Sequence, residues 1–450
     1  MILITGGTLV TLGPENRVLT GHAVLMDGDR VVQIGPAAEV AQAAAGARRI
    51  DADGRLVMPG LVCAHHHLYS TFARGVPLTS FSPGSFVQIL EGLWWKLDLV
   101  LAKGDLRLSA LPVLMDALRA GTTTVIDHHE SQGYQEGALD ELASACREIG
   151  VRACLTLGAS DRLGRGPEGV AENRRFINAC RNAPDDLIRP LVGLHAPFTV
   201  NDETLEASRE LAQAAGIGLH IHVAEDRADQ AHSLERHGVR AIQRLGRAGA
   251  LDARTLVAHG IHLERAEREM LASAGSWILH NPESNMNNAV GAADVVGLVR
   301  DGINVALGTD GMSSDMRAQM RAAFLLQRHL HGDPRVAWME SLGLLLDANA
   351  RLASAIWGRP VGSLAVGGVG DAVIFDYDPP TPLDAGNLGG HLIFGLLDAP
   401  VHATIVGGAV RYENGAFTGV DARAVNAQAR GAAARFWQRF AATPDVKSRA

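Results

Sequence analysis

Short apolar runs recur along the middle of the chain and are separated by amphipathic stretches. Eight of these runs are rich in β-branched and aliphatic residues, and they cover residues 61–64, 122–127, 151–157, 188–194, 217–223, 254–258, 276–279 and 303–307. Between them, apolar residues recur at helical spacing, for example in residues 204–215 and 317–329. Strands that alternate with helices over about 300 residues predict an α/β fold, the (β/α)₈ TIM barrel.

A doubly wound open sheet is the alternative arrangement for the same alternating pattern. That fold commonly binds phosphate through a Gly-x-Gly-x-x-Gly turn between a strand and a helix. None of the predicted helices in the middle of the chain begins with such a turn. The barrel is therefore the favoured prediction.

The two ends of the chain share a pattern that differs from the middle. Short β-rich runs separated by Gly-containing turns lie at residues 2–4, 8–11, 24–26, 31–34, 371–376 and 403–411. We expect residues 1–57 and 366–420 to form one small β-sandwich domain, and residues 58–365 to form the barrel. Residues 421–450 are predicted to be a helix, capped by Asp421, and its tail. Two unrelated β appendages are the alternative to the composite domain.

Composition excludes several classes of protein. The 450 residues are 47% hydrophobic and 20% charged, which is typical of a packed globular chain and not of a disordered one. The net charge of −8 and the lack of a long basic run argue against nucleic acid as a partner. No apolar stretch approaches the ~18 residues that a membrane-spanning helix needs. A small-molecule substrate is the expected partner.

The start of the chain and its cysteines bear on the compartment. The first residues, MILITGG, contain neither a charged leader nor a sustained apolar segment, so we expect no secretory signal. Four cysteines in a chain of this length do not indicate a disulfide framework. The cytoplasm is therefore the expected location.

Potential metal ligands follow several of the predicted strands. His65 and His67 share one side of the first strand because side chains at i and i+2 point the same way, whereas His66 points elsewhere. Later strands lead to four further residues of this kind, His195, His222, His259 and Asp310. Barrel active sites form at these strand ends, so the set predicts a metal centre.

The residue types indicate which metal the centre would hold. Imidazoles together with a carboxylate suit Zn²⁺ or Fe²⁺ better than Mg²⁺ or Ca²⁺. A second metal would need a bridging ligand such as a carbamylated lysine. The only three lysines are Lys96, Lys103 and Lys447, and none ends a predicted central strand. One divalent metal ion is therefore predicted, with zinc favoured and iron as the alternative.

Glu225 follows His222 by three residues, where the chain leaves its strand. In that position a carboxylate can reach a metal-bound water without binding the metal, as a proton shuttle requires. A helix-capping role beside Asp226 is the alternative. His259 could be a ligand, could support a ligand, or could donate a hydrogen bond to the attacking oxygen.

Several segments resemble the amidohydrolase superfamily, and within it the purine, pterin and triazine aminohydrolases, most closely the SsnA-like group. The resemblance covers nearly the whole chain. The segments that carry it are PGLVCAHHH (59–67), LWWKLD (93–98), GTTTVIDHHES (121–131), GLHIHVAED (218–226), TLVAHGIH (255–262), HNPESNMNNAVG (280–291) and LGTDGMSSD (307–315). It implies a metal-dependent barrel, a small β domain and a homodimer.

The resemblance also implies roles for individual residues. His65, His67, His222 and Asp310 would hold one divalent metal, Glu225 would shuttle protons, and His259 would position the nucleophile or polarise the substrate. His195 would lie over the substrate. Several relatives have a glutamine soon after the His-x-His pair that recognises the ring, and this chain has Ser70 there. That departure puts purine specificity in doubt.

Further substrate contacts are predicted around the mouth of the barrel. The candidates are Arg74, Trp94, Trp95, His128, His129 and Asn285. The tryptophans could stack on a flat ring or anchor a loop, and Arg74 could instead form a surface ion pair. Only one of the two histidines can point into the barrel. Asn285 could support a metal-bound histidine, whereas Asp315 is expected to cap the following helix.

The expected reaction is hydrolytic deamination of an amino-substituted heterocycle or an amidine-like small molecule. A bound metal lowers the pKa of its water from about 15.7 to about 7, Asp310 accepts the water proton, and Glu225 protonates the substrate. Ring opening of a cyclic amide, or displacement of an alkylamine or halide, is the alternative on the same site. A non-catalytic scaffold is disfavoured because the full set of candidate residues is present.

Overall fold

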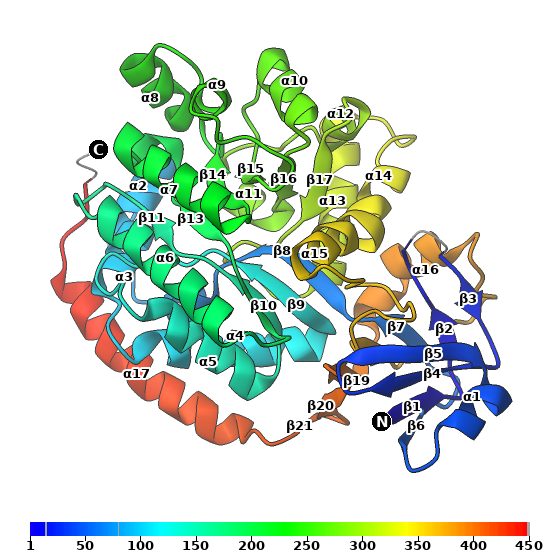
Figure 1. The fold of residues 1–450 in the computed structure, drawn as a ribbon. Helices are drawn as coiled ribbons and strands as arrows, with labels where there is room; N and C mark the ends of the chain where they lie inside the picture. Colours follow the sequence, from blue (N-terminus) through cyan, green and yellow to red (C-terminus); the bar gives the residue numbers. More distant parts are fainter. Residues whose placement is uncertain (14–15, 80, 448–450) are drawn as a thin grey trace.

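The computed structural model of the chain describes residues 1–13, 16–79 and 81–447. Parallel strands form a central barrel with helices packed around it (Figure 1). In chain order the barrel strands are β8 (Leu61–His66), β9 (Thr122–Asp127), β10 (Arg152–Leu155), β12 and β13 (Ile188–Pro190, Val192–Leu194), β14 (Leu219–Val223), β15 (Leu256–His259), β16 (Trp277–His280) and β17 (Asn304–Leu307). The predicted (β/α)₈ barrel is thus confirmed, and the doubly wound sheet is excluded.

The last strand closes the barrel on the first. His66 and Asp310 form a parallel bridge, and the backbone N–H of Thr309 donates to the carbonyl of His65 at 2.9 Å. The predicted fourth strand is interrupted at Leu191, so β10 pairs with β12 whereas β11 (Gly158–Ala159) pairs with β13. Closure places the carboxyl ends of the first and last strands side by side.

Helices form the outer layer and carry the local signals that the sequence predicts. Asn201 caps α7 (Asp202–Ala215), and Asp315 caps α13 (Met316–His331). The other helices around the barrel are α4 (Asp105–Ala120), α5 (Ala138–Ile149), α6 (Gly166–Asn182), α8 (Arg227–His237), α9 (Ala241–Arg247), α10 (Arg265–Ala274), α11 (Pro282–Asn287), α12 (Val295–Arg300), α14 (Trp338–Gly343), α15 (Asn349–Trp357) and α16 (Leu388–Phe394).

Both ends of the chain contribute to the small β domain beside the barrel (Figure 1). One sheet has the strand order β5-β4-β1-β6 and comes from the N-terminal segment, while the second has the order β21-β20-β19-β18-β7-β2-β3 and combines both ends. The N-terminal elements are β1 (Ile2–Thr5), β2 (Thr8–Val10), β3 (Val18–Leu19), β4 (His22–Asp27), β5 (Arg30–Pro36), α1 (Ala37–Ala43), β6 (Arg48–Asp51) and β7 (Leu56–Pro59). The C-terminal ones are β18 (Ala372–Phe375), β19 (Val401–Val406), β20 (Ala409–Glu413) and β21 (Ala416–Phe417).

The remaining elements flank the open end of the barrel. After β8 the chain forms α2 (Phe86–Ile89), a π-helical turn (Leu90–Trp94) and α3 (Trp95–Val100). The C-terminal helix α17 (Ala422–Ala442) packs against α3 and α4, and Asp421 caps it as predicted. Among the described residues, no helix combines the length and the apolar composition that crossing a bilayer requires.

Candidate metal centre and active site

A cavity opens where the carboxyl ends of the barrel strands meet. Its empty volume is about 870 Å³, counted together with its open mouth. The lining includes His67, His195, His222, Glu225, His259 and Asp310. The structure therefore brings residues from five different strand ends to one concave site, which is where barrel enzymes carry their chemistry.

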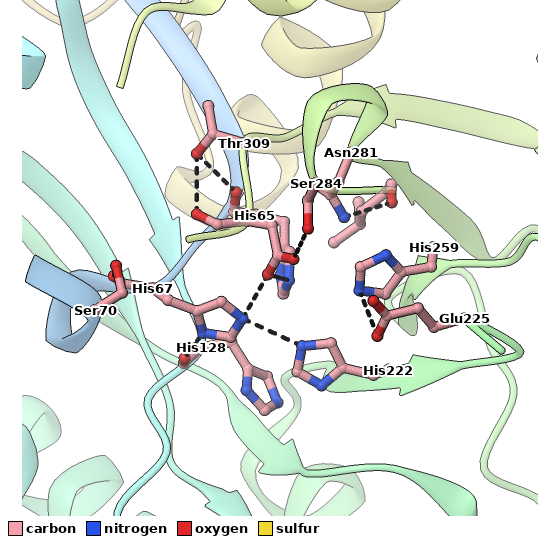
Figure 2. A network of polar contacts seen from close by, with 12 residues as sticks. His65, His67, Ser70, His128, His222, Glu225, His259, Asn281, Ser284 and Thr309 are labelled. Carbon is pink, nitrogen blue, oxygen red and sulfur yellow. Dashed lines mark hydrogen bonds and ion pairs between the residues drawn. The ribbon is translucent and has the colours of Figure 1, made fainter. Parts of the chain in front are cut away.

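Four of the predicted residues place their ligand atoms in one cluster at the base of this cavity. The ligand atoms of His65, His67, His222 and Asp310 all lie within 4.8 Å of one another. Asp310 Oδ1 is 2.7 Å from His67 Nε2 and 3.4 Å from His65 Nε2, and His222 Nε2 is 3.3 Å from His67 Nε2 (Figure 2). Three imidazoles and a carboxylate are a donor set that suits a zinc or iron ion.

Hydrogen bonds hold each of the three rings with its Nε2 directed to the cluster. Nδ1 of His67 donates to the carbonyl of His128 at 2.5 Å, and Nδ1 of His222 donates to the carbonyl of His195 at 2.8 Å. Nδ1 of His65 lies 2.9 Å from His220 Nε2, while the buried Nε2 of His65 has no hydrogen-bond partner. Partners of this kind fix the ring that binds a metal and leave Nε2 as the ligand atom.

The electrostatics of the cluster favour a positive charge. Burial lowers the pKa of His65 to about 3, so its imidazole is neutral and can act as a ligand. Burial also opposes protonation of His67, but the neighbouring Asp310 carboxylate outweighs it and the pKa of His67 rises to about 9. His67 in turn holds the pKa of the buried Asp310 well below its usual range. The residues present thus fit a divalent cation.

Glu225 and His259 face each other at the side of this cluster. Glu225 Oε2 is 3.4 Å from His259 Nε2 (Figure 2). Asn288 donates to Glu225 Oε1 at 3.3 Å. Asn285 Oδ1 accepts from His259 Nδ1 at 2.8 Å, which holds the His259 ring with Nε2 turned toward the Glu225 carboxyl. Burial raises the pKa of Glu225 to about 7, which suits a group that exchanges protons near neutral pH. Asp226, not Glu225, caps α8.

The backbone is strained at three positions of the site. Ala224, His259 and Asp310 have φ values of 55°, 72° and 55°, which non-glycine residues rarely adopt. Ala224 directly follows β14, His259 ends β15, and Asp310 follows β17 by three residues. The turns at these positions direct side chains toward the cluster. Strain of this kind is typical of functional sites, where surrounding structure stabilises it.

Three of the predicted substrate contacts lie in the cavity wall. His195 lines the cavity, and its Nδ1 is 2.6 Å from Thr199 Oγ1. Trp94 also lines the cavity, and so does Trp95, which is almost fully buried. Stacking of Trp94 on a flat ring stays a prediction, while Trp95 packs in the wall.

Four of the predicted substrate contacts are not among the described residues that line the cavity. The Arg74 side chain is 66% exposed and faces Asp116 at 3.5 Å, so it forms the surface ion pair that was the alternative. His128 and His129 are buried, with His128 behind the ring of His222 at 4.5 Å between centroids. Asn285 contacts His259 and not a metal ligand. Contact of these four residues with the substrate stays a prediction, because strand ends also supply residues that support a site from behind.

A buried ion-pair cluster in the cavity wall was missed by the sequence analysis. Asp98 and Glu130 line the cavity, and Arg162 NH2 lies 2.6 Å from Asp98 Oδ2 and 3.5 Å from Glu130 Oε2. The Arg162 guanidinium also lies over the ring of Trp95, 5.1 Å from its centroid. Asp98 lies in α3 and the other two lie in separate loops after barrel strands, so no common spacing joins them in the sequence.

Ser284 is a second residue that the sequence analysis overlooked. Its Oγ donates to Asp310 Oδ2 at 2.5 Å (Figure 2). This hydrogen bond orients the carboxylate so that Oδ1 faces the imidazoles. Ser284 lies within the segment HNPESNMNNAVG that carries the family resemblance, and this was the available signal.

Comparison with known proteins agrees with this geometry. A family model described as the amidohydrolase family matches residues 56–411. The 5-methylthioadenosine/S-adenosylhomocysteine deaminase of Pelotomaculum thermopropionicum is 30% identical over 97% of this chain and 99% of the relative. The 8-oxoguanine deaminase of Pseudomonas aeruginosa is 33% identical over 92% of this chain and 94% of the relative. The crystal structure of a Xanthomonas campestris adenosine deaminase with bound zinc superposes with a TM-score of 0.84 at 26% identity, covering 97% of this chain and 98% of that one.

Proposed function

Because this chain belongs to the amidohydrolase family, we propose that it catalyses the hydrolytic deamination of an amino-substituted heterocycle. The observation that carries the proposal is the convergence of four metal-ligand candidates on one cavity beside Glu225. The relatives named as deaminases of methylthioadenosine and of 8-oxoguanine support this reaction over ring opening or halide displacement.

His65, His67, His222 and Asp310 would hold one divalent cation, and we propose zinc. When bound, such a cation lowers the pKa of a coordinated water to about 7, so that a nucleophile is available at neutral pH. The zinc in the similar adenosine deaminase structure supports this choice of metal. The other two groups of possible ligands in the described residues each share a member with this cluster, which supports a single ion. Metal analysis of the purified protein should find one equivalent.

Two side chains would move the protons, and a third would orient one of them. Asp310 Oδ2, oriented by Ser284, would accept a proton of the attacking water. Glu225, with a pKa raised to about 7, would donate a proton through its carboxyl to a ring nitrogen of the substrate. His259 Nε2 faces Glu225 Oε2 and keeps that carboxyl turned toward the metal cluster. The amino group would take the proton held by Asp310 and leave as ammonia, and the hydroxyl proton of the added water would return to Glu225 as the carbonyl forms.

The charges of the cavity limit the substrate. The described residues that line it include six carboxyl side chains, Asp98, Glu130, Glu225, Asp226, Asp229 and Asp310, and neither lysine nor arginine. The outer wall is apolar and includes Phe86, Leu90 and Phe198. A phosphate or carboxylate group on the substrate would find neither a lysine nor an arginine partner in this lining. We therefore propose an uncharged or cationic flat heterocycle with an apolar or neutral substituent.

An ammonia-release screen of the zinc-loaded protein tests the reaction. The panel should pair aminopurines, pterins, triazines and guanidino compounds with phosphorylated counterparts where these exist, and Glu225→Gln provides the matched inactive control. Ammonia release from an unphosphorylated amino-heterocycle supports the proposal. A ring-opened acid, or chloride or alkylamine release without ammonia, would favour the alternative hydrolase instead.

We also propose that the protein acts as a homodimer in the cytoplasm. Large apolar side chains are exposed on neighbouring helices α14 and α16, where Met339 and Phe394 are 72% and 64% exposed. Light scattering of the purified protein would show whether two copies associate.

A further inference from the structure

One wall of the cavity is a short segment that we call the rim segment, residues 86–95. It contains α2, the π-helical turn and the start of α3. Phe86, Leu90, Trp94 and Trp95 all come from it and line the cavity. The position of these ten residues therefore sets the shape of the apolar side of the substrate site.

The rim segment does not hold its own position. It is part of one continuous helical stretch, in which α2, the π-helical turn and α3 follow one another without a break from Phe86 to Val100. A helical stretch of about 15 residues is only marginally stable on its own in water, and the π-helical turn interrupts the regular hydrogen-bond pattern within it. The segment must therefore be positioned by what packs against it from outside the cavity.

The C-terminal tail, residues 443–447, supplies this packing. The backbone N–H of Val446 donates to the carbonyl of Glu91 at 3.0 Å, and Lys447 forms an ion pair with the Glu91 side chain. The Val446 side chain is buried in one apolar cluster with Phe86, Leu90, Trp95 and Val290. Three members of that cluster line the cavity, so Val446 packs directly behind the wall of the substrate site.

Helix α17 brings the tail to this place. Trp437 Nε1 donates to the carbonyl of Phe72 at 2.8 Å, and Arg439 Nε donates to the carbonyl of Val100 at 3.1 Å. The Lys96 ammonium lies 4.4 Å from the centroid of the Phe440 ring. Figure 1 shows α17 along the outside of the barrel, with the end of the chain returning toward α2. The helix thus contacts the chain on both sides of the rim segment, and the tail contacts its middle.

We propose that Val446 is a positioning residue for the substrate site and that the C-terminal tail holds the rim segment in its binding-competent place. The tail lies about 350 residues away from the rim segment in sequence, and it contacts neither the metal-ligand candidates nor Glu225 among the described contacts. Loosening it affects how often the apolar wall is formed and leaves the reacting groups unchanged. For its kinetic readout the inference rests on the proposed deamination.

Val446→Ala tests the inference, with Val425→Ala as the matched control. Val425 lies in the first turns of α17 and is 7% exposed, against 8% for Val446, so both variants lose the same atoms from equally buried positions. Suppose that Val446→Ala lowers the fraction of molecules whose rim segment is in its binding-competent place to a third of the wild-type fraction. KM then rises roughly threefold while kcat is unchanged. Val425→Ala should leave KM unchanged. Equal KM values for wild type and Val446→Ala would overturn the inference.

Amide hydrogen exchange of residues 86–95 tests the same inference without relying on turnover. Val446→Ala should exchange faster in this segment than wild type and Val425→Ala, and Val446→Asp, which places a charge in the apolar cluster, should exchange faster still. Unchanged exchange in Val446→Asp would refute the role of the tail. If the segment loosens as expected but no compound of the panel releases ammonia, the proposed reaction fails and the role of the tail stands.

Discussion

Two buried clusters of charged and titratable groups lie at opposite ends of the barrel, and they differ in how their polar atoms are satisfied. At the carboxyl ends of the strands, His65, His67, His222 and Asp310 crowd their ligand atoms together, and His65 Nε2 has no hydrogen-bond partner. The backbone of Asp310 is strained as well. The protein groups of this cluster alone do not satisfy all of its buried polar atoms.

The second cluster joins the barrel to the small β domain and is complete. Arg152, on β10, donates to both carboxylate oxygens of Asp371 at 3.0 and 2.9 Å and to Asp29 Oδ1 at 2.6 Å. Asp371 also accepts from the backbone N–H of Gly407 at 2.9 Å, and Arg359 pairs with Asp29. The two carboxylates raise the pKa of Arg152 far above its usual value against the effect of burial.

The contrast shows how buried charge differs between a functional and a structural role. Buried polar groups are normally hydrogen-bonded, because an unpaired one costs free energy. A cluster that satisfies itself stabilises the contact between two parts of the chain. A cluster that leaves ligand atoms unpaired and backbone strained is stable only when something else completes it, and here the donor set fits a cation. Mutations at the two clusters should therefore have opposite consequences for activity and stability.

Glu225→Gln should have the largest effect on activity. The amide keeps the shape of the side chain but cannot donate the proton, so we expect kcat to fall by about 10²–10⁴-fold, the usual range for general acid–base catalysis. Steady-state ammonia release measures this, and metal analysis should show an unchanged metal content.

Asp226→Asn is the control for that variant. Asp226 is adjacent in sequence, lines the same cavity and caps α8 by accepting from Ala228 N at 2.9 Å, and asparagine caps a helix equally well. Its kcat should stay close to that of wild type. If Glu225→Gln and Asp226→Asn turned over equally well, Glu225 would not be the proton carrier.

Arg152→Met should have the largest effect on stability. It leaves Asp371 buried without its cation, and removing one partner of a buried pair costs about 3–5 kcal/mol. Denaturant unfolding measures this loss, while kcat of the folded protein should be unchanged because Arg152 lies at the amino end of β10, opposite the carboxyl ends that form the cavity. The double variant Arg152→Met, Asp371→Leu should recover part of the stability, since it removes both charges. No recovery in the double variant would argue against the ion pair as the cause.

The pH dependence of kcat should separate Glu225 from the structural carboxylates. Burial raises the pKa of Glu225 to about 7 from the usual 4.5, so the protonated form is present below pH 7 and is lost above it. A group that must donate its proton therefore makes kcat fall about tenfold per pH unit on the alkaline side. A pH profile of kcat in the metal-loaded enzyme measures this limb. A rate that stays level from pH 7 to pH 9 would contradict proton donation by Glu225.

The fold was largely predictable because its signals are local and repeated. All eight predicted runs contain barrel strands, and the caps Asp315 and Asp421 were recognised from their residue types. The break at Leu191 was not predicted. Gly193 approaches the neighbouring strand so closely that a Cβ would lie 2.4 Å from the Leu157 carbonyl, and such an approach depends on tertiary contacts.

The candidate metal centre was predictable for a similar reason, whereas the cavity wall was not. His65 and His67 are spaced for one side of a strand, and His222 and Asp310 follow strands that end at the same edge of the barrel. The residues of the wall come from segments that connect strands, and the strand pattern does not determine the paths of these segments. Arg162 lies in one of them and is buried against Trp95, which no spacing in the sequence indicates.

Arg74→Ala should have the smallest effect and sharpens the same contrast from the surface. The sequence analysis placed Arg74 near the substrate, but its side chain is 66% exposed and pairs with Asp116 at 3.5 Å. An exposed ion pair contributes about 0–1 kcal/mol, because solvent screens both charges. We therefore expect KM to change less than about twofold, and stability to change by less than about 1 kcal/mol. Steady-state kinetics and denaturant unfolding measure both quantities. A tenfold rise in KM would show that Arg74 reaches the substrate. In that case the limit on substrate charge that was inferred from the cavity lining would be wrong.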